Sequence, residues 1–262
     1  MDSAPNFPLN SLLLDGIPVI WIEPLNRYAA TRLALWLPPF STRKEIVESK
    51  LRDLARAGLF AMSFDPYQHG ARSAETSSDL TSRIFSNFQR HMWPILGQTT
   101  LDALRVIDWA LDRFQLKPDV FVGGDSMGGD IAVALAGKDK RITRVVAIVA
   151  TPDWMRPGMH RLHDPDRLQP LGEPDAYARF FYEHLNPLTH LENYTHGPSI
   201  FFECGANDTH VPSDGALRFK VALEQKFPAL IDRVRVNIVP GAAHMDSKKP
   251  PFWENALHWL TT

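Results

Sequence analysis

The chain has 262 residues, of which 44% are hydrophobic and 22% are charged, and its formal net charge is −2 at pH 7. This is ordinary globular composition, and the length suits one large domain or two small ones. The near-neutral charge gives no general attraction to nucleic acid or to anionic lipid, so neither is expected as a partner.

Short β-rich runs alternate with helical patterns along the chain. Strands are predicted at 17–23, 32–38, 59–65, 119–124, 144–150, 199–205 and 233–239. Helices are predicted at about 44–57, 100–114, from 126 onward, 214–227 and 252–260. Nearly continuous apolar strands between helices are typical of a mostly parallel sheet that is covered by helices on both faces. The sequence therefore predicts an α/β fold.

Residues 152–197 interrupt this alternation. The segment is rich in proline and aromatic residues and contains no obvious strand. An insertion of this length between two strands of a sheet is more often a lid than a slack loop. We expect a single domain over 1–262, with 152–197 forming a small helical cap.

No targeting or membrane segment is expected. No run approaches about 18 uninterrupted apolar residues, which predicts no membrane span. The opening "MDSAPNFPLNSLLLDG" lacks a basic region ahead of an apolar one, which predicts no signal peptide. Cys204 is the single cysteine, which excludes an intramolecular disulfide and fits a reducing compartment. We expect a cytoplasmic protein in which Cys204 is a buried structural thiol.

Ser126 lies between glycines in "FVGGDSMGG", directly after a predicted strand and directly before a predicted helix. Gly124, Ser126 and Gly128 form a G-x-S-x-G pattern. Small neighbours let a strand turn sharply into a helix and expose the serine at the apex of the turn. A purely structural glycine turn would also give this pattern. The adjacent Asp125 is expected to be a solvated carboxylate.

Two further residues complete a candidate catalytic set. Asp208 follows the strand predicted at 199–205, and His244 follows the strand predicted at 233–239. The carboxyl ends of parallel strands meet at one edge of a sheet, so these side chains can approach Ser126. A hydroxyl, an imidazole that takes its proton and a carboxylate that orients the imidazole form a nucleophilic triad. Asp214 and Asp246 compete with Asp208, but only Asp208 directly follows its strand.

Four segments resemble the α/β-hydrolase superfamily: "GDSMGG", "GANDTHVP", "PGAAHMD" and "SFDPYQHGARS". The resemblance covers most of the chain and implies an α/β-hydrolase fold and acyl transfer to water. "LWLPPFSTRKE" occupies the place of the family's oxyanion loop, with Pro38 and Pro39 in place of His-Gly. Pro39 has no N–H to donate, so the amides of Phe40 and Met127 are the expected oxyanion donors.

The resemblance is nearest to dienelactone-hydrolase-like and acetyl-esterase-like enzymes, and extends to serine-dependent esterases that open macrolide lactones. Trp154 and Trp93 could offer an apolar surface to a bulky ester or lactone, or could simply pack the cap onto the body. His69 is expected to be structural or to line the substrate site.

Alternatives to this substrate class remain open. They are a small-ester or thioester hydrolase and a non-catalytic α/β-hydrolase scaffold that binds a ligand. A peptidase is expected less, because no acidic cluster for a free amino terminus is visible. Neither a cofactor nor a metal is expected, since Cys204 has no companion and no H-E-x-x-H pattern occurs.

Overall fold

The computed structural model describes residues 7–28 and 31–262. Its main sheet has eight strands in the order β1-β2-β4-β3-β5-β6-β9-β10. Their bounds are β1 (Asn10–Leu14), β2 (Ile17–Ile22), β3 (Arg32–Leu37), β4 (Phe60–Phe64), β5 (Lys117–Asp125), β6 (Ile142–Ile148), β9 (Ser199–Gly205) and β10 (Val234–Val239). The β1–β2 and β2–β4 pairs are antiparallel, and every other pair is parallel. The predicted mostly parallel α/β sheet is confirmed.

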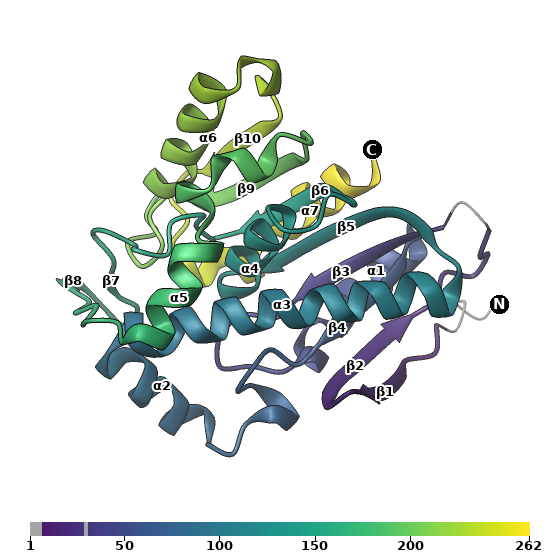
Figure 1. Ribbon diagram of the computed structural model, residues 1–262, viewed down its shortest axis with the longest axis horizontal. Helices are drawn as coiled ribbons and strands as arrows, with labels where there is room; N and C mark the ends of the chain where they lie inside the picture. Colours follow the sequence, from purple (N-terminus) through teal and green to yellow (C-terminus); the bar gives the residue numbers. More distant parts are fainter. Residues whose placement is uncertain (1–6, 29–30) are drawn as a thin grey trace.

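Helices cover both faces of this sheet (Figure 1). One face packs against α1 (Glu48–Arg56) and α7 (Phe252–Thr261). The opposite face packs against α3 (Phe88–Phe114), α4 (Met127–Ala136) and α6 (Asp214–Lys226), and α2 (Ser77–Ser86) and α5 (Ala176–Leu185) pack on α3. Short 3-10 turns complete the chain: η1 (Lys44–Val47), η2 (Gly70–Arg72), η3 (Pro187–Thr189), η4 (Leu191–Tyr194), η5 (Pro228–Leu230) and η6 (His244–Lys248).

The period of two along β3 explains the two cores. Leu35 and Leu37 point into the core beneath α3 and α4, whereas Ala34 and Trp36 point into the core beneath α1 and α7. Alternate side chains of a strand face opposite sides of the sheet, so an all-apolar strand must be covered on both. No helix in the described part of the chain is both long and apolar enough to cross a membrane.

The first strand and the long helix differ from the sequence prediction. The prediction missed β1, although the Asp15-Gly16 turn that joins it to β2 is a recognised hairpin signal, with φ of 47° and 84°. Helix α3 begins at Phe88 instead of residue 100, because Asn87 caps it by accepting a hydrogen bond from the Arg90 amide at 3.2 Å. The helix continues through Pro94. Consequently the segment around Trp93 belongs to a helix rather than to a loop.

The segment 152–197 lies between β6 and β9, and it contains α5 and a short hairpin of β7 (His160–Arg161) and β8 (Asp164–Leu168). The expectation that it holds no strand was therefore wrong. Helix α5 packs closely on α3, where Trp93 stacks on Tyr182 with ring centroids 4.4 Å apart. A Cβ on Gly97 would lie 2.1 Å from the Phe181 ring, so a glycine is needed at this crossing. That the segment acts as a cap over a substrate stays a prediction.

Candidate active site

Ser126 occupies a strained turn between β5 and α4, with φ of 51° and ψ of −118°. A Cβ on Gly124 would lie 2.3 Å from the carbonyl carbon of Gly128, and a Cβ on Gly128 would lie 2.2 Å from the carbonyl oxygen of Leu37. Both contacts are far shorter than a real Cβ allows. The flanking glycines therefore let α4 start directly above β5, and this start exposes the serine hydroxyl at the apex.

The structure brings Ser126, Asp208 and His244 together at the carboxyl edge of the parallel strands. The Ser126 hydroxyl lies 3.1 Å from Nε2 of His244 and can donate to it. Nδ1 of the same imidazole lies 2.7 Å from Oδ2 of Asp208. With the Nδ1 proton donated to the carboxylate, Nε2 carries the lone pair that a general base needs.

Asp208 is fixed by the backbone of its own turn. Its Oδ1 accepts hydrogen bonds from the amides of His210 at 3.0 Å and Val211 at 2.8 Å, which leaves Oδ2 for His244. The competing acids are engaged elsewhere. Asp214 pairs with an arginine of its own helix, and Asp246 accepts from the Ala243 amide and pairs with a lysine. Of the three candidate acids, only Asp208 reaches the imidazole.

The acid turn and the histidine loop are joined through backbone contacts. The Asn207 amide donates to the carbonyl of Ala242 at 2.8 Å. A Cβ on Gly205 would lie 2.5 Å from that same oxygen, so only glycine lets the two loops approach this closely. These contacts set the relative position of Asp208 and His244.

The two expected oxyanion donors lie at the start of α4 and on the loop after β3, and these two segments touch where Gly128 meets Leu37 and Pro38. Met127 is the first residue of α4, and Phe40 follows the Pro38-Pro39 pair, whose loop Thr42 ties by donating to the Pro39 carbonyl at 2.6 Å. Among residues 7–28 and 31–262, no protein acceptor takes a hydrogen bond from either the Phe40 or the Met127 amide. First-turn amides of a helix lack intrahelical partners and are suited to bind an anion. A role for either amide stays a prediction.

Asp125 points to the side of the sheet that α1 covers, and the expectation of a solvated carboxylate was wrong. Its carboxylate is buried and accepts hydrogen bonds from the Trp36 indole at 3.0 Å and from Lys50 at 2.5 Å. The Lys50 ammonium also lies 5.1 Å from the ring centres of Trp36 and Trp253. This pair fixes the residue that precedes the nucleophile to α1. Sequence reasoning missed Lys50, because no local signal links it to residue 125.

Trp154 and Trp93 are both buried, at 0% and 2% exposure, which corrects the expectation of an open apolar surface. The Trp93 indole donates to the Trp154 carbonyl at 2.9 Å, and the Trp154 amide donates to the side chain of Asn186 at 2.9 Å. Of the two interpretations, the structure favours packing of the segment 152–197 onto α3. Neither indole offers a surface to a substrate in this conformation.

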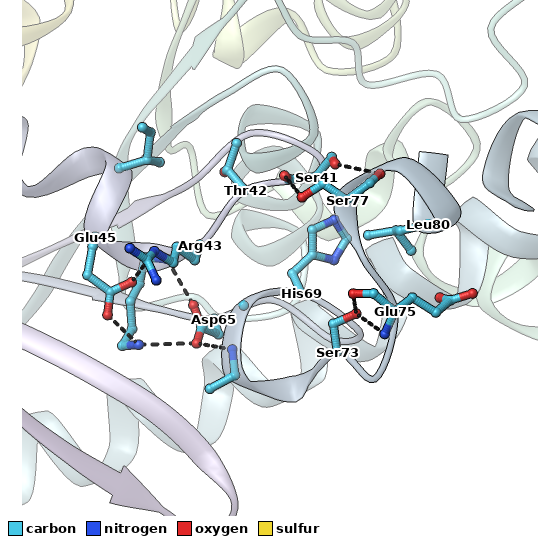
Figure 2. A pocket seen from close by; sticks show the side chains of 14 residues that line it. Ser41, Thr42, Arg43, Glu45, Asp65, His69, Ser73, Glu75, Ser77 and Leu80 are labelled. Atoms are coloured by element: carbon cyan, nitrogen blue, oxygen red, sulfur yellow. Dashed lines mark hydrogen bonds and ion pairs between the residues drawn. The ribbon is translucent and has the colours of Figure 1, made fainter. Parts of the chain in front are cut away.

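His69 lies under the loop that carries Phe40, with ring centroids 5.4 Å apart, and its Nδ1–H donates to the Tyr67 carbonyl at 2.9 Å. It lines a cavity of about 730 Å³ that none of the three triad residues lines. Figure 2 shows its side chain pointing toward Ser41 and Ser77, whose hydroxyls each donate to the other's carbonyl at 3.2 Å. Burial lowers the pKa of His69, so the ring is neutral. His69 therefore lines this cavity, and its role in a substrate site stays a prediction.

A buried ion pair ties α4 to the segment 152–197. The Asp130 carboxylate accepts a hydrogen bond from the Thr151 amide at 2.7 Å and pairs with Arg156. Burial raises the pKa of Asp130, and the Arg156 guanidinium opposes this shift. Asp130 lies about one helical turn after Ser126. The ion pair therefore anchors the 152–197 segment to the helix that follows the nucleophile.

Cys204 is buried in β9 as expected, and burial together with the carboxylates of Asp208 and Glu203 raises its pKa to about 12. An unreactive structural thiol is the result. In the described part of the chain, no group of three or more His, Cys, Asp or Glu side chains could hold a metal ion.

Comparisons with known proteins relate the chain to serine hydrolases. No curated protein sequence matches. The protein TT1662 of Thermus thermophilus is 23% identical over 98% of this chain and 97% of its own, with a TM-score of 0.75. An esterase of Pyrococcus furiosus is 16% identical over 97% and 92%, with a TM-score of 0.66.

An acylaminoacyl peptidase of Pyrococcus horikoshii is 14% identical over 98% of this chain, with a TM-score of 0.69, and the match spans only 40% of the peptidase. These likenesses support the α/β-hydrolase fold. Residues 81–261, which include Ser126, Asp208 and His244, match the model of the prolyl oligopeptidase family. This match covers more than half of the chain, which therefore belongs to the prolyl oligopeptidase family within the α/β-hydrolase superfamily.

Proposed function

We propose that the protein hydrolyses carboxylic esters, lactones included, through an acyl-enzyme formed on Ser126. The observation that carries this proposal is the continuous path from Asp208 Oδ2 through His244 to the Ser126 hydroxyl, with steps of 2.7 and 3.1 Å. Both distances lie within the range in which a proton can move along a hydrogen bond.

The reaction follows from this path. His244 Nε2 takes the hydroxyl proton as Ser126 Oγ attacks the ester carbonyl, and a tetrahedral oxyanion forms. His244 then returns that proton to the departing alcohol as the acyl–oxygen bond breaks. Water attacks the acyl-enzyme in the same way and releases the acid and the free serine. Asp208 stabilises the imidazolium in both steps without being protonated.

The developing oxyanion needs donors that are already in place. The amide of Met127, at the start of α4, and that of Phe40, after two prolines, fit this role. Removal of one such donor typically costs about 10²–10³ in kcat.

An ester of modest size is the substrate class we favour. The expectation of a bulky, largely apolar substrate depended on Trp154 and Trp93 as an open apolar surface, and their burial removes that support. The macrolide lactone depended on the resemblance of the elbow and on the predicted cap, and it stays a prediction. Hydrolysis of a peptide bond is the second candidate, because the family match is to prolyl oligopeptidases. The same triad serves both reactions.

A fluorophosphonate probe and simple esters test this proposal. The protein should be labelled at Ser126, and Ser126→Ala should abolish labelling and lower hydrolysis of p-nitrophenyl acetate by several powers of ten. His244→Ala should be comparably impaired. An intact protein that neither reacts with the probe nor cleaves esters or peptide p-nitroanilides would instead be a non-catalytic binding scaffold.

A further inference from the structure

His210 packs against the proposed base without belonging to the triad. Its ring centroid lies 5.0 Å from that of His244, with the planes 73° apart, and 5.9 Å from the Phe85 ring. It follows Asp208 by two residues, and its own amide donates to that carboxylate. The His210 ring therefore borders His244, the residue that would return a proton to the leaving group.

The orientation of this ring is fixed from the other side by β7. Nδ1 of His210 lies 2.8 Å from the carbonyl of His160, and the His160 amide donates to the Thr209 carbonyl at 2.9 Å. A carbonyl can only accept, so the Nδ1 atom carries the proton. The opposite nitrogen, Nε2, is then a lone-pair acceptor.

The ring is held in this neutral form. His210 is only 7% exposed, and burial lowers its pKa to about 3, with the neighbouring His244 acting in the same direction. In the described part of the chain Nε2 of His210 has no hydrogen-bond partner. The atom nevertheless keeps some contact with solvent. Nε2 of His210 is therefore an oriented acceptor without a protein partner, in a ring that packs on His244.

We propose that His210 is a specificity-determining residue, whose Nε2 accepts a hydrogen bond from the departing part of the substrate. The residue would favour leaving groups that carry a hydrogen-bond donor in addition to the reacting oxygen or nitrogen substituent. These are alcohols with a second hydroxyl and amines with a further donor group besides the reacting nitrogen. The inference rests on the proposed acyl transfer at Ser126 and His244.

Two esters that differ only in the donor provide the test. 2-Hydroxyethyl butyrate and propyl butyrate have the same acyl group and leaving groups of equal heavy-atom number. The quantity to measure is the ratio of their kcat/KM values, by titration of the released acid. This ratio is independent of the fraction of enzyme that is folded, so a partly destabilised variant remains informative.

His210→Asn and His210→Phe separate the two nitrogens. The asparagine amide can still donate to the His160 carbonyl but has no group at the Nε2 position, whereas phenylalanine keeps only the ring packing. Both variants should lower the ratio about three- to tenfold, which is the value of one neutral hydrogen bond. The exposed His163→Asn is the matched control and should leave the ratio unchanged.

Equal losses on both esters leave the ratio unchanged, and this result would overturn the inference and give His210 a purely positioning role. A failure of the proposed function has a different signature, because the wild-type protein would then release no acid from either ester in a Ser126-dependent manner.

Discussion

The substitution Gly128→Ala should damage the site through the backbone of the proposed oxyanion loop. The new Cβ would lie 2.2 Å from the Leu37 carbonyl oxygen and 2.8 Å from that of Pro38. A carbon and an oxygen in contact stay about 3.2 Å or more apart, so β3 and α4 must separate by about 1 Å. The Phe40 amide follows directly along the displaced chain.

This displacement sets the magnitude. A misplacement of about 1 Å in a catalytic arrangement costs about 10²-fold in rate, and overpacking of a core costs about 1–3 kcal/mol in the free energy of unfolding. We therefore expect kcat for p-nitrophenyl acetate to fall by about two powers of ten, while the protein stays folded. Circular dichroism melting and steady-state kinetics measure the two effects separately.

Ala132→Gly in the same helix is the control. It should destabilise α4 by about 1 kcal/mol without adding an atom near the loop, so its kcat should stay near the wild-type value. A Gly128→Ala enzyme with wild-type kcat would refute the reasoning, and so would an Ala132→Gly enzyme that is equally impaired.

Four further predictions concern buried groups. Lys50→Met should cost about 1–3 kcal/mol by leaving the Asp125 carboxylate without its cation, and Asp125→Asn in the same chain should recover part of this loss in urea unfolding. Trp154→Ala should cost about 3–5 kcal/mol in stability and impair small and bulky esters equally, contrary to a substrate-contact role. Cys204 should resist a thiol reagent at pH 8 until the protein is unfolded, so rapid labelling of the native protein would contradict its burial. The pKa of His210 is about 3 in the folded protein and about 6.5 in the unfolded chain, so between these pH values only the unfolded chain binds the proton. The free energy of unfolding should therefore fall as the pH drops through this window. His210→Asn should flatten that fall, as measured by urea midpoints.

Local patterns were sufficient for seven of the eight strands of the main sheet, for the nucleophile turn and for the order of the triad residues. Apolar runs bounded by glycine and proline mark strands that the sheet buries on both faces, and the glycines around Ser126 are required by contacts within the turn itself. The long helix was predicted too short, because the Asn87 cap and Pro94 gave opposing local signals. Strand β1 was overlooked despite its Asp-Gly turn.

Roles that depend on non-local contacts could not be read in this way. Nothing near residue 125 indicates that Lys50 pairs with its carboxylate, and nothing near Trp154 indicates that its backbone bonds to Asn186 and Trp93. His210 acquires its orientation only when β7 meets the turn after β9. The sequence by itself determined which side chains carry reactive groups and at which strand ends they lie, since strand period and glycine turns are local. Tertiary structure alone decided which of these groups are buried, paired or left as free acceptors, because burial and pairing depend on segments far apart in the chain.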